Sequence, residues 1–227
     1  MKTFFKTVGW LVLFFAVALG LLYGLRNFNR EPSVLFTNTT CEPPCWAGIQ
    51  PGITTYQQIY ARLNLVEQID QTSIAENYNR DGSNESIFWY FSRPAEDSAG
   101  SIYLLNNQVT AISVLTIGSL TLSDIIEKLG APDQYWSEIG VGENREYTDI
   151  FLLYPEKGYC IELVIDLRNS SGSVTVKEKT PVYRVTYFDP KLYQDLLKTK
   201  LLITTPTKDR KGSFQAWSGF GTITIPQ

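Results

Sequence analysis

The sequence predicts an α+β fold: an N-terminal transmembrane helix followed by two tandem modules, each a helix plus an antiparallel three-strand meander. Three observations lead to this prediction. An apolar run occupies residues 8–25, a helical pattern occurs twice, and each copy of it precedes three strand-like runs. One helix on a small sheet gives a two-layer module. Two modules side by side form one two-layer body and bury a larger core than either could alone.

The first helical pattern begins after Thr55, a residue type preferred at helix N-caps. Gln58, three residues later, can complete a capping box. Residues at the spacing of one buried helix face follow, namely Tyr56, Ile59, Tyr60 and Leu63. The sequence therefore predicts a helix over residues 55–64.

The second copy begins at Thr121, with Asp124 at the third helical position. The same apolar spacing follows at Leu122, Ile125, Ile126 and Leu129. Gly52 and Gly118 stand at matching positions before the two caps, which favours a true internal repeat. Gly130 then ends the second helix, because glycine is the usual residue just past a helix C-terminus.

Each helix is followed by runs rich in β-branched and aromatic residues between turn formers. These runs are 87–91, 102–105 and 109–115 in the first module, and 150–154, 159–167 and 182–188 in the second. Asn106 and Asn107 favour a tight hairpin, because asparagine tolerates positive φ. Each module is thus predicted as helix, polar connector and three antiparallel strands.

The apolar run at residues 8–25 lies between Lys2 and Lys6 on one side and Arg26 and Arg30 on the other. Its length is close to the roughly 20 residues that a bilayer-spanning helix needs. A cleaved signal peptide is the alternative, with residues 18–20 as a small-residue site. We expect an uncleaved anchor that makes the membrane a partner. The chain would then be membrane-anchored, with residues 31–227 extracytoplasmic.

The three cysteines favour a structural disulfide formed outside the cytoplasm. Two prolines between Cys41 and Cys45 favour extended backbone, which would separate the two Cα atoms by roughly 12 Å. A bond between them therefore requires a turn. Cys160 is the competing partner, and alternation along the predicted strand 159–167 places it on the less apolar face. We predict that Cys41 and Cys45 are bonded and that Cys160 is free.

Several chemistries are excluded or disfavoured by composition. The chain contains no histidine, which excludes Ser-His, Cys-His and His-metal sites. Glu162 and Asp166 share a strand face about 13 Å apart, farther than the roughly 5–9.5 Å of a glycosidase pair. The net charge of −3 argues against a nucleic-acid partner. We predict no catalytic residues, no metal and no cofactor.

The aromatic run at residues 87–91 is the remaining clue to function. Strand alternation puts Phe88 and Tyr90 opposite Ile87, Trp89 and Phe91. One set can pack on the helix, and the other must meet the second module, a partner or water. Packing between modules is one interpretation of Phe88 and Tyr90. A partner surface is the other, since exposed aromatic patches mark interfaces.

The predicted organisation has five parts. They are an anchor or signal segment at 1–30, a linker with the Cys-Pro-Pro-Cys segment at 31–50, module 1 at 51–116, module 2 at 117–190, and a C-terminal helix and tail at 191–227.

A family resemblance rests on Pro51, Gly52, Ile53 and Thr54 in module 1 and on Leu129, Gly130 and Pro132 in module 2. This signature resembles the SmpA/OmlA-type small lipoprotein of the outer-membrane β-barrel assembly machinery, and its tandem form resembles β-lactamase inhibitor protein. The segment from Cys41 to Gly52 also resembles the C-x-x-P-C-W-x-G-I-x-P-G pattern of uncharacterised exported bacterial proteins. The resemblance implies binding or scaffolding.

We therefore expect a membrane-anchored extracytoplasmic binding or scaffold module of the cell envelope, with an envelope protein as a candidate partner. A cell-envelope hydrolase using carboxylates that the sequence does not identify is the alternative. A structural envelope protein without a defined ligand is a third possibility.

Overall fold

The computed structural model describes residues 15, 41, 43–78, 84–92, 99–116, 120–141, 146–167, 172–199, 201–203 and 214–225. The chain divides into two compact units, Met1–Thr37 and Asn38–Gln227. The elements below all belong to the second unit.

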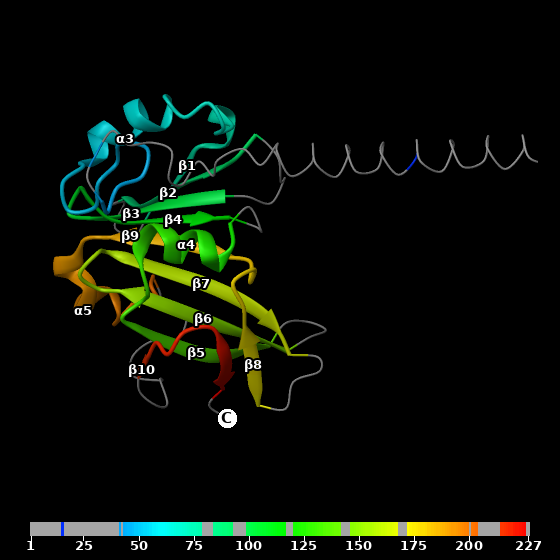
Figure 1. The fold of residues 1–227 in the computed structure, drawn as a ribbon. Coiled ribbons are helices and arrows are strands. Elements are labelled where there is room, and N and C mark those ends of the chain that lie inside the picture. The colour runs from blue at the N-terminus through cyan, green and yellow to red at the C-terminus, as the bar shows by residue number, and fades with distance from the viewer. Residues whose placement is uncertain are drawn as a thin grey trace, which may run out of the picture. The chain divides into compact units, whose positions relative to one another are not determined.

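A nine-stranded antiparallel sheet dominates this unit, with strand order β1-β2-β3-β4-β9-β7-β6-β5-β10 (Figure 1). Its strands are β1 Ala75–Tyr78, β2 Asn84–Tyr90, β3 Ala99–Leu105, β4 Gln108–Leu115, β5 Gln134–Val141, β6 Glu146–Tyr154, β7 Tyr159–Asp166, β9 Arg184–Phe188 and β10 Gln215–Ala216. A second sheet pairs β8 Ser173–Val176 with β11 Gly221–Thr224. The helices are α3 Tyr56–Leu63, α4 Leu122–Leu129 and α5 Tyr193–Leu196, with 3-10 turns η1 Gln71–Ser73 and η2 Pro190–Leu192.

The large sheet consists of two halves that meet where β4 pairs with β9. β1 to β4 form the first half in chain order, and β9, β7, β6, β5 and β10 form the second. At the junction Ser113 lies opposite Thr186, and their hydroxyl oxygens are 3.3 Å apart. The two halves therefore share one continuous hydrogen-bonded sheet.

Both predicted helix starts are confirmed. The Thr55 N–H donates to Gln58 Oε1 at 3.0 Å, and the Thr121 N–H donates to Asp124 Oδ2 at 2.8 Å, so each helix has a capping box. The hairpin between β3 and β4 is confirmed as well. Asn106 and Asn107 both have positive φ, at 50° and 65°.

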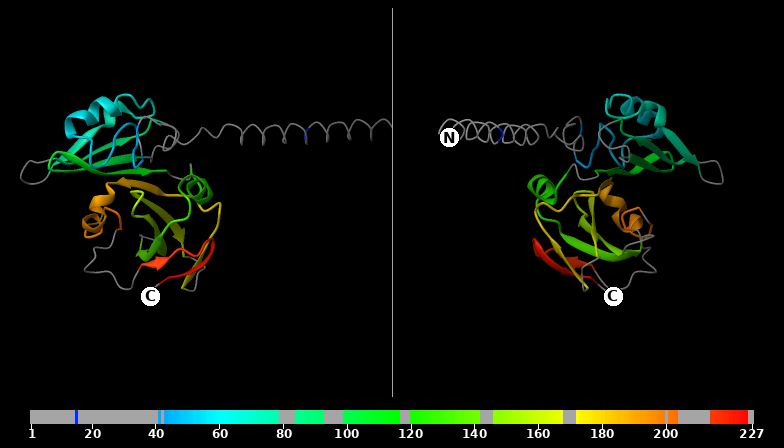
Figure 2. Two further views of the ribbon diagram at one scale, coloured as in Figure 1. Left: turned by 60° about the vertical axis from the view of Figure 1, so that its left-hand side comes forward. Right: turned by 90° about the vertical axis from the view of Figure 1, so that its right-hand side faces the viewer.

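The sheet has two faces that are covered differently. α3 and α4 lie on one face, which we call the helix face. Tyr60 of α3 donates to Glu76, the cross-strand neighbour of Ile87. The Tyr154 hydroxyl donates to the carbonyl of Gly130, which follows α4. The far face is covered over the second half by α5, and Figure 2 shows α4 and α5 on opposite sides of these strands. Buried residues on that side include Trp136, Phe151, Leu153, Phe188 and Leu196.

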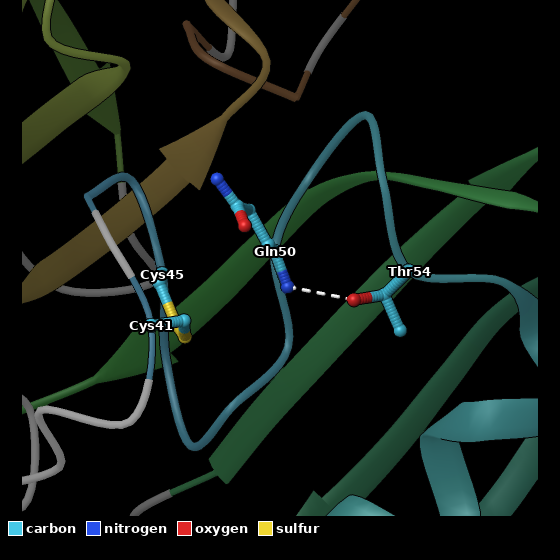
Figure 3. Close-up of a disulfide and its surroundings, with 4 residues drawn as sticks. All are labelled: Cys41, Cys45, Gln50 and Thr54. Atoms are coloured by element: carbon cyan, nitrogen blue, oxygen red, sulfur yellow. Dashed lines mark hydrogen bonds between the residues drawn. A yellow bond between two sulfur atoms is a disulfide. The ribbon is translucent and has the colours of Figure 1, made fainter.

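The segment at residues 41–54 contacts both halves of the sheet. Gly52 N–H donates to the Val109 carbonyl at 2.8 Å at the start of β4. Pro44 lies against Gly158, where an added Cβ would overlap both Pro44 and the Phe188 carbonyl. Figure 3 shows the turn in this segment, where the Gln50 N–H donates to Thr54 Oγ1 at 2.8 Å. The segment at residues 41–54 therefore links the first half of the sheet to the second.

The predicted fold class is wrong in its architecture. The described residues form mostly antiparallel sheet with three short helices, rather than a transmembrane helix followed by helix-plus-meander modules. β1 and β5 were not predicted as strands. In the large sheet, β1 to β4 lie between α3 and α4, and β5, β6, β7, β9 and β10 follow α4. The C-terminal tail adds β10 and β11, since it can pair with the edge of β5 and with β8.

The predicted anchor at residues 8–25 lies outside the described residues, apart from Phe15. Within the part of the chain that the structure describes, we find no helix with both the length and the apolar character needed to cross a membrane. The predictions of a transmembrane helix and of a membrane-anchored location depended on such a helix and are contradicted by this finding. The membrane as a partner stays a prediction.

Candidate functional site

The predicted surface residues Phe88 and Tyr90 lie on the far face of β2. Tyr90 is 48% exposed and Phe88 is half-buried, with ring centroids 6.5 Å apart and ring planes at 78°. This is the edge-to-face arrangement that aromatic pairs prefer. Their neighbours on β3 are Ser101, opposite Phe88, and Ala99, opposite Tyr90.

Strand β3 shows why this surface is accessible. Gly100 and Ile102 are buried on the helix face, whereas Ala99, Ser101 and Tyr103 are partly exposed on the far face. Beyond β3 the far face is covered, since Ala111 of β4 is buried among residues of the second half. Tyr103 packs against the same buried residues and marks the border of the covered region. We call Phe88, Tyr90, Ala99 and Ser101 the open face.

An aromatic stack on the helix face supports the strand that carries Phe88 and Tyr90. Trp89 points to the helix face, has no exposed surface, and stacks on Trp46 with ring centroids 5.1 Å apart. Phe91 meets both indoles edge-on at 6.4 Å. Gly100 is required beside this stack, because a Cβ there would overlap the Trp89 ring. The backbone that carries Phe88 and Tyr90 is therefore firmly held.

The structure contains a disulfide between Cys41 and Cys45, whose Cα atoms are 6.0 Å apart (Figure 3). The turn between them includes a cis Pro43–Pro44 peptide. Cys160 is free and buried, and its thiol donates to the Leu202 carbonyl at 3.3 Å. Burial raises the pKa of the Cys160 thiol, so it stays protonated and unreactive at neutral pH.

Sequence reasoning missed a carboxylate cluster on the far face of the second half. Cross-strand pairing places Glu138 opposite Asp149, and Glu162 opposite Arg184, with which it forms a salt bridge. Asp149 and Glu162 are almost fully buried, at 6% and 5% exposure. Desolvation, with Glu162 and Glu138 nearby and Arg184 opposing, raises the pKa of Asp149 to about 7. Desolvation also raises the pKa of Glu162, against the effect of Arg184.

This cluster could not be found from single-strand spacing. The sequence analysis compared Glu162 only with Asp166 on the same strand and found them too far apart, whereas the neighbours of Glu162 come from β6 and β9. Only the hairpin register between β6 and β7 would have shown that Asp149 approaches it. Among the described residues, no group of three or more acidic or cysteine side chains has the geometry to hold a metal ion.

No family model matches the chain, and no curated protein matches it. Among solved structures, the chain is similar to a cysteine-rich secretory protein from Staphylococcus aureus at 8% sequence identity, with a TM-score of 0.33. The match covers 77% of this chain and 56% of that protein.

Proposed function

We propose that this chain is a non-catalytic binding module whose open face binds another protein. The observation that carries the proposal is the edge-to-face pair of Phe88 and Tyr90 on a part of the far face that none of the described helices covers. Large aromatic side chains dominate the energy of protein interfaces. An exposed pair of aromatic side chains on a protein surface favours a role in docking a partner.

The open face also has the mixed polarity of a binding surface. Ser101 lies directly opposite Phe88, and the exposed Tyr90 carries a hydroxyl, so both add polar groups beside the Phe88 ring. Because Trp46 and Trp89 hold β2 from the other side, little ordering entropy would be lost on binding. The resemblance to SmpA/OmlA-type and β-lactamase inhibitor proteins supports the same function, since it implies binding or scaffolding.

The carboxylate cluster supports a second candidate function, a hydrolase that uses Asp149 and Glu162. Groups with strongly perturbed pKa values gather at catalytic sites. However, a substrate must reach such groups, and both side chains are buried. Glu162 is also engaged by Arg184, as in structural ion pairs. We therefore prefer the binding function.

Photo-cross-linking from the open face tests the proposal. A benzophenone amino acid replaces Tyr90 in the full chain, and the protein is irradiated in its native host. We expect a discrete set of protein adducts, identified by mass spectrometry. The Phe88→Ala change should reduce their yield at least about tenfold, the effect of a hot-spot residue.

Tyr183 provides the matched control, because it is 40% exposed and lies outside the open face. The same photoreactive residue at position 183 should give none of the adducts seen from position 90. Identical adducts from both positions, or no adducts from position 90, would contradict a binding role for the open face.

A further inference from the structure

Three tyrosines surround one carboxylate at the outer edge of the sheet. The hydroxyl of Tyr56 donates to Glu76 Oε1 at 2.7 Å, and that of Tyr60 donates to the same oxygen. The hydroxyl of Tyr78 donates to Glu76 Oε2. Tyr56 and Tyr60 come from α3, whereas Glu76 and Tyr78 come from β1. We call these four residues the tyrosine–glutamate site.

The carboxylate in this site keeps its negative charge. The hydrogen bonds from Tyr60 and Tyr78 lower the pKa of Glu76. Desolvation and the bond to Glu76 raise the pKa of Tyr60, so the phenol stays neutral. No lysine or arginine of the described residues forms an ion pair with Glu76. Within the part of the chain that the structure describes, neutral hydrogen-bond donors alone therefore stabilise this charge.

The site is accessible and is flanked by aromatic rings. The rings of Tyr56 and Tyr60 are nearly perpendicular, at 89° with centroids 6.3 Å apart. Tyr78 is 55% exposed, and the other three side chains are half-buried. β1 is the terminal strand of the sheet order, so its outer edge carries no further described strand. Tyr56 and Tyr60 thus pack edge to face, and both direct their hydroxyl groups at the carboxylate.

We propose that the tyrosine–glutamate site binds the cationic side chain of a lysine or arginine from a partner protein. A carboxylate has about four acceptor positions, and the three phenols occupy three of them. An N–H of the cation can take the remaining one as a charge-assisted hydrogen bond. The negative site thus selects a basic side chain over a neutral one.

The tyrosine–glutamate site is separate from the open face, and binding at one does not depend on binding at the other. Glu76 lies directly opposite Ile87, so the tyrosine–glutamate site is on the helix face. Phe88 and Tyr90 point to the far face from the same sheet. Each site can therefore fail its own test without affecting the other.

An NMR titration tests the proposal with defined probes. The full chain, labelled with ¹³C in its tyrosine rings, is titrated with N-acetyl-arginine methylamide. N-acetyl-citrulline methylamide, which has nearly the same shape without the charge, is the neutral control probe. We expect saturable shifts of the Tyr56, Tyr60 and Tyr78 signals with the arginine probe and none with the citrulline probe. The lysine analogue should give the same pattern.

Three variants separate binding from a structural role. Glu76→Gln should weaken arginine binding at least about tenfold, because a charge-assisted hydrogen bond is lost. Tyr78→Ala, at an exposed position, should weaken it severalfold and leave the fold intact. Glu67→Gln removes an exposed carboxylate elsewhere and should change nothing.

Equal shifts with arginine and citrulline would overturn the proposal. So would a loss of binding in Glu67→Gln as large as that in Glu76→Gln, because it would show only general attraction between charges. If the site served only to tie α3 to β1, Glu76→Gln would lower stability while the wild-type chain showed no arginine-specific shift.

Discussion

Replacing Trp89 with alanine should lower the free energy of unfolding by about 3–5 kcal/mol, the range for deleting a buried tryptophan side chain. Trp89 has no exposed surface, stacks on Trp46 and meets Phe91 edge-on. Its removal would leave a cavity between β2 and the segment at residues 41–54. Since small domains are stable by only about 5–15 kcal/mol, the variant should be marginally folded. Urea unfolding followed by far-ultraviolet circular dichroism measures the loss.

The neighbouring residue on the same strand is the control. Phe88→Ala removes a large aromatic side chain from the open face, where it is only half-buried. We expect a loss near 1 kcal/mol or less, as for substitutions away from the core. Equal losses in the two variants would show that the assignment of helix face and open face along β2 is wrong.

Replacing Asp149 with asparagine should stabilise the protein at pH 8 and have little effect near pH 4. The pKa of Asp149 is raised from 3.8 to about 7 in the folded protein. As the pH rises through this interval, the unfolded chain loses its proton first, so ionisation favours unfolding. Stability from the protonated Asp149 is therefore fully present below pH 3.8 and is lost as the pH rises to about 7.

The size of this effect follows from the same interval. At about 1.4 kcal/mol per pKa unit, the span from 3.8 to about 7 sets an upper bound of ~4 kcal/mol. Solvent reaches the half-buried Glu138 and screens part of the repulsion, so we expect about 1–3 kcal/mol.

Unfolding curves at a series of pH values measure the stability difference between Asp149→Asn and the wild type. Asp195→Asn, at an exposed helix position, is the matched control. A stability difference for Asp149→Asn that does not change between pH 4 and pH 8 would contradict the raised pKa.

The features that could be predicted are those set by short-range pattern. Thr55 and Thr121 each precede a four-position apolar face, and both helices form where that pattern lies. Asn106 and Asn107 adopt the positive φ that their side chains tolerate. Alternation along β2 also separates Phe88 and Tyr90 from the buried Ile87 and Trp89.

The features that could not be predicted depend on contacts distant in sequence. β1 has the polar sequence Ala-Glu-Asn-Tyr, and it is a strand because it pairs with β2 and its Glu76 accepts bonds from α3. β5 is a strand because it pairs with β6 along its whole length. Cys160 was placed on the less apolar strand face, yet α5 and Leu202 bury it. The carboxylate cluster likewise exists only through strand register.

Hydrogen–deuterium exchange of the full chain, with and without the partner identified by cross-linking, tests the central claim most directly. Our account predicts that binding slows amide exchange in β2 and β3, which carry the open face. Exchange in β6 and β7, whose far face carries Asp149 and Glu162 of the carboxylate cluster, should be unchanged. Protection confined to β6 and β7, with no change in β2 and β3, would contradict the assignment of partner binding to Phe88 and Tyr90.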